Sequence, residues 1–415
     1  MEGLLHYVWH HRAFPPEELH STDGRVIEVI DVGKHNLDQG PDFFNAKIKI
    51  DGTLWAGNVE IHNQASDWYA HRHNDDERYD NTILHVIGKE DAQIVTHNGQ
   101  RPPQLVLKVP IEIERRYDEL QRTEDYPRCH RLVPSIAPMK VHAWTDALLV
   151  ERLMERSKQV LDRVARLGGD WERATFVTLA RNFGFGLNGD AFEIWAGRIP
   201  LMAAAKHRNN IEQVAAIFLG IAGFLDTDKA YLKKTGIEEN VLQREWLFLK
   251  NKFGPMEPMA EGQWKHMRIR PQNFPEVGIM HLAQLYCSGK CSLHSLLEQT
   301  EADSLHKTLH DCGITASASR LLTINTVVPV LYAYGIMHNN DALRERAVMF
   351  LESLGAEENR IMRQWRDCGL KVENAADSQA LLWLKQNYCD RRRCLDCRFG
   401  MEFLSVPEKV ITNNE

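Results

Sequence analysis

The stretch Pro41–His62, which reads PDFFNAKIKIDGTLWAGNVEIH, determines the fold of the N-terminal region and carries most of its chemistry. Two strand-like runs flank Asp51-Gly52, a dipeptide typical of a tight hairpin turn. The hairpin brings Asp42, at the start of the first strand, beside Glu60, near the end of the second. Because side chains alternate along a strand, Glu60 and His62 lie on one face. The sequence therefore predicts two carboxylates and one basic side chain together at the open end of a hairpin.

These residue types suit a divalent-metal site. Mg²⁺ prefers oxygen ligands and is often held by one or two carboxylates while keeping several waters. Such an ion lowers the pKa of its water and stabilises charge on a phosphoryl oxygen. A neutral imidazole nearby can accept the proton of that water near pH 7. We therefore expect Asp42 and Glu60 to bind Mg²⁺ or Mn²⁺, and His62 to take part in the proton transfer.

A second group of polar residues follows in SDWYAHRHNDDERYDNTILHV. His71, His73 and Asp76 lie within six residues, and we expect them to complete the metal site or to bind phosphate. His71 and His73 share a face only if the backbone between them is extended, because on a helix they diverge by roughly 200°. The alternative is a polar loop, with His85 of the following strand buried in the core.

Composition limits the class of protein. A chain of 415 residues exceeds one typical domain, and 43% hydrophobic with 26% charged residues is ordinary for a soluble globular protein. No apolar run approaches the roughly 18 residues of a membrane span, and the N-terminus lacks the pattern of a secretory signal. These features predict a cytoplasmic protein that does not associate with a membrane.

Charge and histidine are distributed unevenly. Residues 1–110 hold 10 Lys/Arg and 17 Asp/Glu, whereas the remainder holds 40 of each. The acidic excess argues against a broad nucleic-acid footprint on the N-terminal region. The same region contains 10 of the 19 histidines, which favours metal or acid–base chemistry there.

The pattern of apolar residues predicts an α+β protein. An opening amphipathic helix precedes segments that are rich in Val, Ile and Leu and are bounded by turn residues, as strands are. These segments are Arg25–Val32, Phe43–Ile50, Thr53–Ile61, Thr82–Ile87, Ala92–Thr96 and Gln104–Val109, with a short helix or ordered loop over Gln64–Asn81. We therefore expect residues 1–110 to form a helix and a mainly antiparallel sheet.

Helical periodicity replaces the strand pattern further along the chain. Residues 111–136 form a connector, residues 137–388 an all-α domain, and residues 389–415 a Cys-rich C-terminal segment. The expected helices are His142–Leu167, Trp171–Asn182, Asp190–Ala205, Ile211–Gly223, Glu239–Lys252, Phe274–Cys287, Ser319–Gly335, Asp341–Leu354 and Ser378–Tyr388.

The order helix, strand, Asp, strand, Glu-x-basic resembles the PD-(D/E)xK nuclease superfamily over roughly the first 110 residues. The resemblance implies a restriction-endonuclease-like fold and Mg²⁺- or Mn²⁺-dependent phosphodiester hydrolysis on DNA or RNA. Asp42 and Glu60 match its two carboxylates, and His62 stands where the family has lysine. Histidine is mostly neutral at pH 7 and can shift metal preference toward Mn²⁺ or Zn²⁺.

The exchange of lysine for histidine leaves two alternatives to a nuclease. One is a nuclease-like fold that has lost catalysis and serves as a binding or scaffold module. The other is a transition-metal hydrolase of small molecules, which is favoured if His62, His71 and His73 are ligands.

The whole chain has a further resemblance. The phrases GPDFFNAKI, GNVEIHNQASDWYAH, YDNTILHV, RPQNFP and YCDRRRCLDCRFG are similar to a family of bacterial proteins catalogued only as a domain of unknown function. That resemblance implies a multi-domain cytoplasmic protein and no particular activity.

Three of the eight cysteines form a C-x4-C-x2-C motif of Cys389, Cys394 and Cys397. Clustered thiols in a chain without a secretory signal indicate metal or redox chemistry. Zinc and iron–sulfur clusters are usually held by four ligands, so these three cysteines need a fourth, and Cys129 is the best candidate. The arrangement resembles nucleases related to PD-(D/E)xK that bind an iron–sulfur cluster through one distant and three C-terminal cysteines. The alternative is a set of reduced thiols.

Basic residues gather in two stretches of an otherwise acidic protein. Arg391 and Arg392 lie among the C-terminal cysteines, and Arg268 and Arg270 lie in WKHMRIRPQNFP. We expect these four arginines to contact substrate phosphates. The alternative for each stretch is salt bridging to acidic residues of the same domain.

Overall fold

The structure is a computed structural model that describes residues 2–14, 17–36, 38–225, 237–290 and 292–405. The chain divides into two compact units. The first comprises Met1–Lys140, Asp367–Leu370 and Lys385–Glu415, and the second comprises Val141–Arg366 and Lys371–Leu384. The first unit is therefore assembled from both ends of the chain, and the second is inserted between them.

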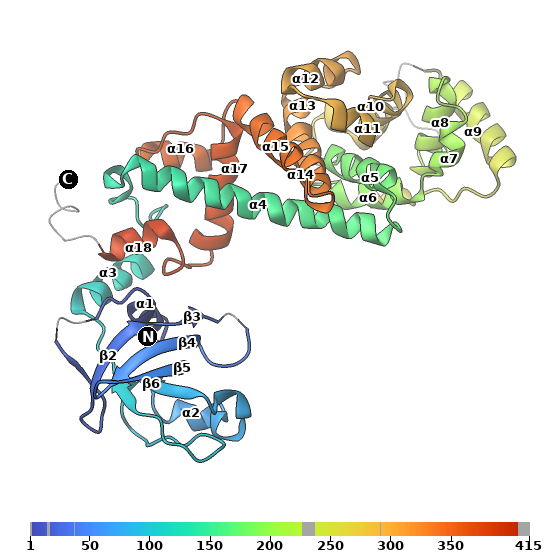
Figure 1. Ribbon diagram of the computed structural model, residues 1–415. Coiled ribbons are helices and arrows are strands. Elements are labelled where there is room, and N and C mark those ends of the chain that lie inside the picture. Colours follow the sequence, from blue (N-terminus) through green and yellow to red (C-terminus); the bar gives the residue numbers. More distant parts are fainter. Residues whose placement is uncertain (1, 15–16, 37, 226–236, 291, 406–415) are drawn as a thin grey trace. The chain divides into compact units, whose positions relative to one another are not determined.

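A seven-stranded mixed sheet forms the centre of the first unit (Figure 1). The strands are β1 (Leu19–His20), β2 (Val26–Asp31), β3 (Lys34–His35), β4 (Phe43–Ile50), β5 (Thr53–Gln64), β6 (Thr82–Lys89) and β7 (Gln104–Val106). Their order is β1-β2-β4-β5-β6-β7, with β3 paired to β4. Strands β2, β4 and β5 are antiparallel neighbours, whereas β6 runs parallel to β5, and β7 runs parallel to β6.

The predicted hairpin is confirmed. Strand β4 pairs with β5 from Ile50↔Thr53 at the turn to Phe43↔Val59 at the open end. Asp51 and Gly52 both have positive φ, 47° and 78°, as a two-residue turn that matches the twist of a hairpin requires. Asp42 and Glu60 directly adjoin the Phe43↔Val59 pair, so the open end of the hairpin carries both carboxylates.

Helices cover both faces of the sheet. Helix α1 (Glu2–His10) buries Leu4, Leu5, Val8 and Trp9, and a methyl group of Leu5 lies 3.3 Å from the position that a Cβ on Gly88 of β6 would take. His85 of β6 points to the opposite face, since side chains alternate along a strand. There the ring of Trp68, from helix α2 (Asp67–Ala70), lies 5.3 Å from the His85 ring. The two helices thus enclose strands β5 and β6.

The crossover from β5 to β6 contains α2 and two short 3-10 turns, His73–Asp75 and Glu77–Tyr79, as expected for Gln64–Asn81. The expected strand Ala92–Thr96 is wrong. Its backbone carbonyls accept hydrogen bonds from side chains instead of from a neighbouring strand. The Trp68 indole bonds to Val95 O at 3.1 Å, and the Gln104 amide bonds to Ala92 O at 3.1 Å.

Both ends of the chain meet in the remainder of the first unit. It contains α3 (Ile111–Arg122), the 3-10 turn Val133–Ser135, the π-helical turn Lys385–Cys389 and α18 (Arg398–Ser405). The buried Arg116 of α3 donates to the carbonyl of Leu404 at 3.1 Å. Residues 389–405 of the expected C-terminal segment therefore pack within the N-terminal unit, and residues 406–415 lie outside the described residues.

The second unit is helical, and the sequence predicted this class. Its helices are α4 (Pro138–Arg166), α5 (Trp171–Phe183), α6 (Gly189–Arg198), α7 (Leu201–Ala205), α8 (Ile211–Ile221), α9 (Glu239–Phe253), α10 (Pro275–Ser288), α11 (Leu293–Glu298), α12 (Ala302–Asp311), α13 (Ala316–Leu322), α14 (Val328–Met337), α15 (Asp341–Ser353), α16 (Arg360–Asp367) and α17 (Ala375–Leu384). The expected helix Asp190–Ala205 is two helices, because Pro200 cannot continue the hydrogen-bond ladder.

One described segment is long and apolar enough to cross a membrane by length and composition alone. It is Ala316–Met337, in which the most apolar 18-residue window has a mean hydropathy of 1.3 and is 67% buried inside the protein. Its centre is the π-helical turn Thr323–Val327, which joins α13 to α14. A helix that is apolar all round and covered by its neighbours is typical of a protein core.

Candidate metal centre

Asp42 and Glu60 are interlocked at the open end of the β4–β5 hairpin. The backbone N–H of Asp42 donates to Glu60 Oε2 at 3.0 Å, and the backbone N–H of Ile61 donates to Asp42 Oδ2 at 2.9 Å. Each carboxylate thus accepts a hydrogen bond from the other strand. The fold brings Asp42 and Glu60 together at the open end of the hairpin, as the sequence predicted.

Burial makes this pair electrostatically unusual. Glu60 is 4% exposed. Burial, followed by the nearby charge of Asp42, raises the pKa of Glu60 to about 9. Burial also raises the pKa of Asp42 to about 6, although the hydrogen bond from Ile61 opposes the shift. Two buried like charges repel one another, so the pair retains a proton at neutral pH unless a cation takes its place.

His62 lies on the same face as Glu60, as predicted. Its Nε2 is 3.6 Å from Glu60 Oε1 and 3.1 Å from His71 Nδ1. Its Nδ1 is 2.9 Å from Nε2 of His85 on the neighbouring strand. Burial, followed by repulsion from His73 and His71, lowers the pKa of His62 to about 3. His62 is therefore a neutral imidazole held on both sides by other imidazoles.

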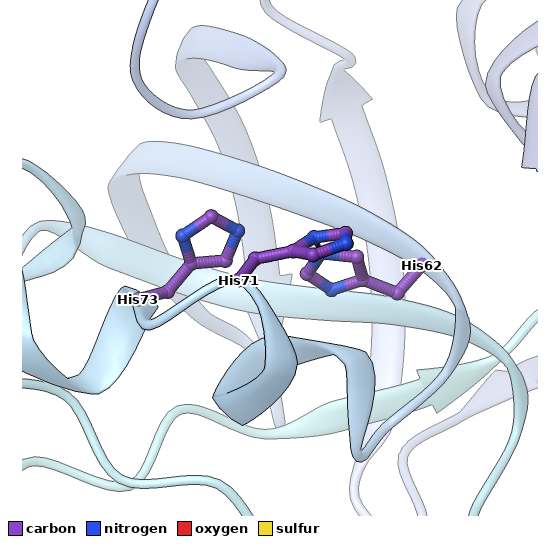
Figure 2. A group of neighbouring side chains, drawn as sticks. All are labelled: His62, His71 and His73. Carbon is purple, nitrogen blue, oxygen red and sulfur yellow. Dashed lines mark hydrogen bonds between the residues drawn. The ribbon is translucent and has the colours of Figure 1, made fainter.

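The crossover delivers His71 and His73 to the same place. Arg72 between them adopts a left-handed conformation with φ 60° and ψ 33°. That residue, and not an extended backbone, allows the two neighbouring rings to converge. One nitrogen from each of His62, His71 and His73 lies within 4.8 Å of the others, and Figure 2 shows the three imidazoles drawn together.

Aromatic rings fix His73 against the carboxylates. Tyr79 stacks on the His73 ring at 3.8 Å between centroids, and the Trp68 ring meets it edge-on at 5.4 Å. His73 Nε2 lies 3.1 Å from Glu60 Oε1. The atom is buried, yet among the described residues it has no partner with hydrogen-bond geometry. A buried nitrogen directed at a carboxylate in this way suits ligation of a shared cation.

The sequence did not single out His6, which contributes from α1. Its Nε2 lies 3.4 Å from Asp42 Oδ2, and its ring contacts those of His35 and Phe43. Burial lowers the pKa of His6. The one signal for this residue was the histidine enrichment of the first 110 residues.

The other predicted site residues lie apart from this group. Asp76 accepts hydrogen bonds from the backbone and guanidinium of Arg78, so its carboxylate is occupied within the crossover. The remaining candidates are exposed arginines, with Arg391 and Arg392 in the first unit and Arg268 and Arg270 in the helical unit.

Arg392 lines a cavity of about 630 Å³ in the first unit. Its other walls include His6, His10 and His35. Asp42 is therefore connected, through its contact with His6, to a cavity that has an arginine in its wall.

The donor set fits a divalent cation. Carboxylates suit Mg²⁺ and Mn²⁺, whereas imidazoles suit Mn²⁺ and Zn²⁺, and the two groups share the Glu60–His73 contact. Asp42 and Glu60 would form an oxygen site. The histidines His62, His71 and His73 would form a nitrogen site beside it.

The chain belongs to the family described as protein of unknown function DUF2851, whose model matches residues 2–313 and 308–360. The match includes all the carboxylates and histidines of the candidate centre, and it ends before Cys389. No curated protein and no solved structure matches the chain.

Proposed function

We propose that this DUF2851 protein is a divalent-metal-dependent phosphodiesterase acting on nucleic acid. The observation that carries the proposal is the buried Asp42–Glu60 pair, in which mutual repulsion and burial disfavour the doubly ionised form that a bound cation would stabilise. A site that concentrates two carboxylates in a low-dielectric environment is unfavourable for stability alone and is typical of functional centres.

The order of elements supports the same reaction class. Helix α1 is followed by the antiparallel strands β2, β4 and β5, then by a crossover to the parallel strand β6. The acidic residues stand at facing ends of β4 and β5. The resemblance to PD-(D/E)xK nucleases rests on the part of this order that runs from the helix through the strands with Asp42 and Glu60.

Each residue has a distinct role in the proposal. Asp42 and Glu60 hold Mg²⁺ or Mn²⁺, which would lower the pKa of a bound water and stabilise negative charge on the phosphate. His73, in contact with Glu60 Oε1, orients that carboxylate. His62 is uncharged and fixed by His85, so it supplies a hydrogen bond in place of the cation that lysine would provide.

A second candidate function rests on the three imidazoles. The nitrogens of His62, His71 and His73 lie close enough for one ion, and neutral histidines are ligands for Zn²⁺. A zinc ion held by three side chains with one open position hydrolyses small-molecule substrates in many enzymes. This alternative predicts stoichiometric zinc that survives the loss of Glu60.

Cleavage assays test the nuclease proposal. Single- and double-stranded DNA and RNA are incubated with the full chain in Mg²⁺ or in Mn²⁺. We expect turnover that falls at least 100-fold in both Asp42→Asn and Glu60→Gln. Glu28→Gln is the matched control, since Glu28 of β2 is exposed and paired with Lys49 at 3.1 Å.

Three outcomes would contradict the proposal. Activity that survives both substitutions would rule out the carboxylate site. Nucleic-acid binding without turnover under either metal would favour the inactive binding module. Zinc that is lost in His71→Ala but retained in Glu60→Gln would favour the small-molecule hydrolase.

A further inference from the structure

Four cysteines from two distant parts of the chain line one small cavity in the first unit. They are Cys129, Cys389, Cys394 and Cys397, and the cavity measures about 20 Å³. Cys129 and Cys397 are buried, and the other two are partly buried. Among the described cysteines none forms a disulfide. The remaining described cysteines, Cys287, Cys312 and Cys368, do not line this cavity.

Three local structures carry these thiols: the turn after α3, the π-helical turn, and the C-x2-C turn that holds both Cys394 and Cys397. Cys129 lies in the turn after α3, where its carbonyl accepts from Leu132 N at 2.9 Å. Cys389 ends the π-helical turn, and Cys397 immediately precedes α18, accepting the first helical hydrogen bond from Met401 N at 2.8 Å. All four cysteines therefore lie in turns or at the end of a helical turn, and their side chains line the same cavity.

The backbone between the last cysteines is packed tightly. A Cβ on Gly400 of α18 would overlap the carbonyl oxygen of Cys394, so only glycine permits this approach. The N–H of Cys397 bonds to the Cys394 carbonyl at 3.4 Å, which closes the C-x2-C turn. The backbone of this turn is thus fixed by packing and hydrogen bonding, which sets the positions of Cys394 and Cys397.

Electrostatics favours a cation among these sulfurs. Burial, followed by the charges of the other three cysteines, raises the pKa of the Cys129 thiol. The thiolates disfavour one another in the absence of a metal, and a bound metal deprotonates its cysteine ligands. Arg128 and Arg393 also line the cavity, and Arg128 donates to the Cys389 carbonyl at 3.4 Å. Their charges oppose the excess negative charge of a tetrathiolate centre.

We propose that Cys129, Cys389, Cys394 and Cys397 ligate one metal centre, either a zinc ion or an iron–sulfur cluster. Both are bound by four thiolates, and each thiol that becomes a ligand releases one proton to solvent. The centre joins the turn after α3 to the C-terminal residues of the same unit. It shares no ligand with the Asp42–Glu60 pair, so it stands or falls independently of the nuclease proposal.

Metal analysis of the full chain, purified without oxygen, tests this proposal. We expect either about one zinc per chain, or about four irons with inorganic sulfide and broad visible absorption. Cys394→Ser should lose that metal, and Cys368→Ser, a thiol of the same unit outside the cavity, should keep it. Glu60→Gln should also keep it, which separates this centre from the carboxylate site.

Native mass spectrometry of the unmutated chain makes the test independent of variant folding. The expected mass exceeds that of the polypeptide by one zinc or one cluster, less the displaced protons, and returns to the polypeptide mass on acid release. Absence of zinc and iron from chain produced with both metals supplied would overturn the proposal. So would an unchanged metal content in a folded Cys394→Ser variant.

Discussion

Binding of Mn²⁺ to the Asp42–Glu60 pair should release a proton, and its affinity should therefore depend steeply on pH. The cause is Glu60, whose pKa is raised from 4.5 to about 9 by burial and by Asp42. The pKa of Asp42, at about 6, leaves that carboxylate largely ionised above neutrality. Between pH 6 and 9, then, the metal must displace mainly one proton, that of Glu60.

The size of the effect follows from the shift. A carboxyl with a pKa near 9 is ionised in only about one molecule in 100 at pH 7. Apparent affinity should therefore rise about tenfold for each pH unit, or about 100-fold from pH 6 to pH 8. Glu60→Gln has no proton to release, so its weaker binding should be nearly independent of pH over that range.

Isothermal titration calorimetry provides the measurement. Titrations of Mn²⁺ at pH 7.5 in two buffers of different ionisation enthalpy report the number of protons released, which should be close to one for the unmutated chain. Neutral His62 and His73 have lost their protons already, since burial lowers both pKa values. A flat affinity in the unmutated chain would therefore refute carboxylate ligation and point to the histidines. So would a Glu60→Gln variant that keeps the full pH slope.

Three further outcomes are expected. In metal-free protein the raised pKa of Glu60 means that the folded state binds more protons than the unfolded state, so the free energy of unfolding should fall as pH rises from about 4.5 to about 9. Thermal melts should show a melting temperature that decreases over this pH range, and the decrease should be smaller in Glu60→Gln. Gly220→Ala should lower the free energy of unfolding by about 1–3 kcal/mol in urea titrations, because its Cβ would overlap the Trp246 ring. The matched helical control is Gly197→Ala, where a Cβ meets no described atom within 4 Å, and equal stability of the two variants would contradict the packing argument. Asp76→Ala should cost about 1 kcal/mol through loss of the cap on Arg78 N and leave Mn²⁺ affinity unchanged by calorimetry; a large loss of affinity would restore Asp76 to the metal site.

The carboxylate pair was predictable because the sequence encodes it locally. Asp51-Gly52 sets the turn, and a hairpin of fixed register then determines which residues face each other across its open end. Residues Phe43–Ile50 were predicted as a strand with the bounds that the structure has. Short-range rules suffice where turn and strands are contiguous.

The sequence predicted which histidines belong to the cluster, but not the backbone conformation that brings them together. Its convergence depends on the left-handed backbone of Arg72, a conformation that is uncommon for a residue other than glycine. The contribution of His6 depends on the docking of α1 against β5 and β6, which is a tertiary contact. The strand predicted for Ala92–Thr96 is wrong for a related reason. Its apolar residues pack around Trp68, whose indole donates to the Val95 carbonyl, and the segment pairs with none of the described strands.

The set of chain segments that make up the first unit could not be predicted from local sequence patterns either. The cysteine motif predicted one link between Cys129 and the C-terminal segment, but no helix or strand periodicity assigns residues 367–370 and 385–405 to the unit of Met1–Lys140. These residues are held by tertiary contacts, which include the four-cysteine cavity and the hydrogen bond from Arg116 to the Leu404 carbonyl. Such pairings follow from the finished packing and not from periodicity.

The insertion of the helical unit has a consequence for the order of biosynthesis. A nascent chain that has emerged only as far as Lys140 contains all the strands of the sheet but not α18. The guanidinium of Arg116 therefore cannot yet donate to the Leu404 carbonyl. More than 220 further residues must leave the ribosome before the last turn of the first unit can dock. Throughout that interval the first unit lacks the contacts that α18 makes with α3, so it stays incomplete until residues 398–405 have been synthesised.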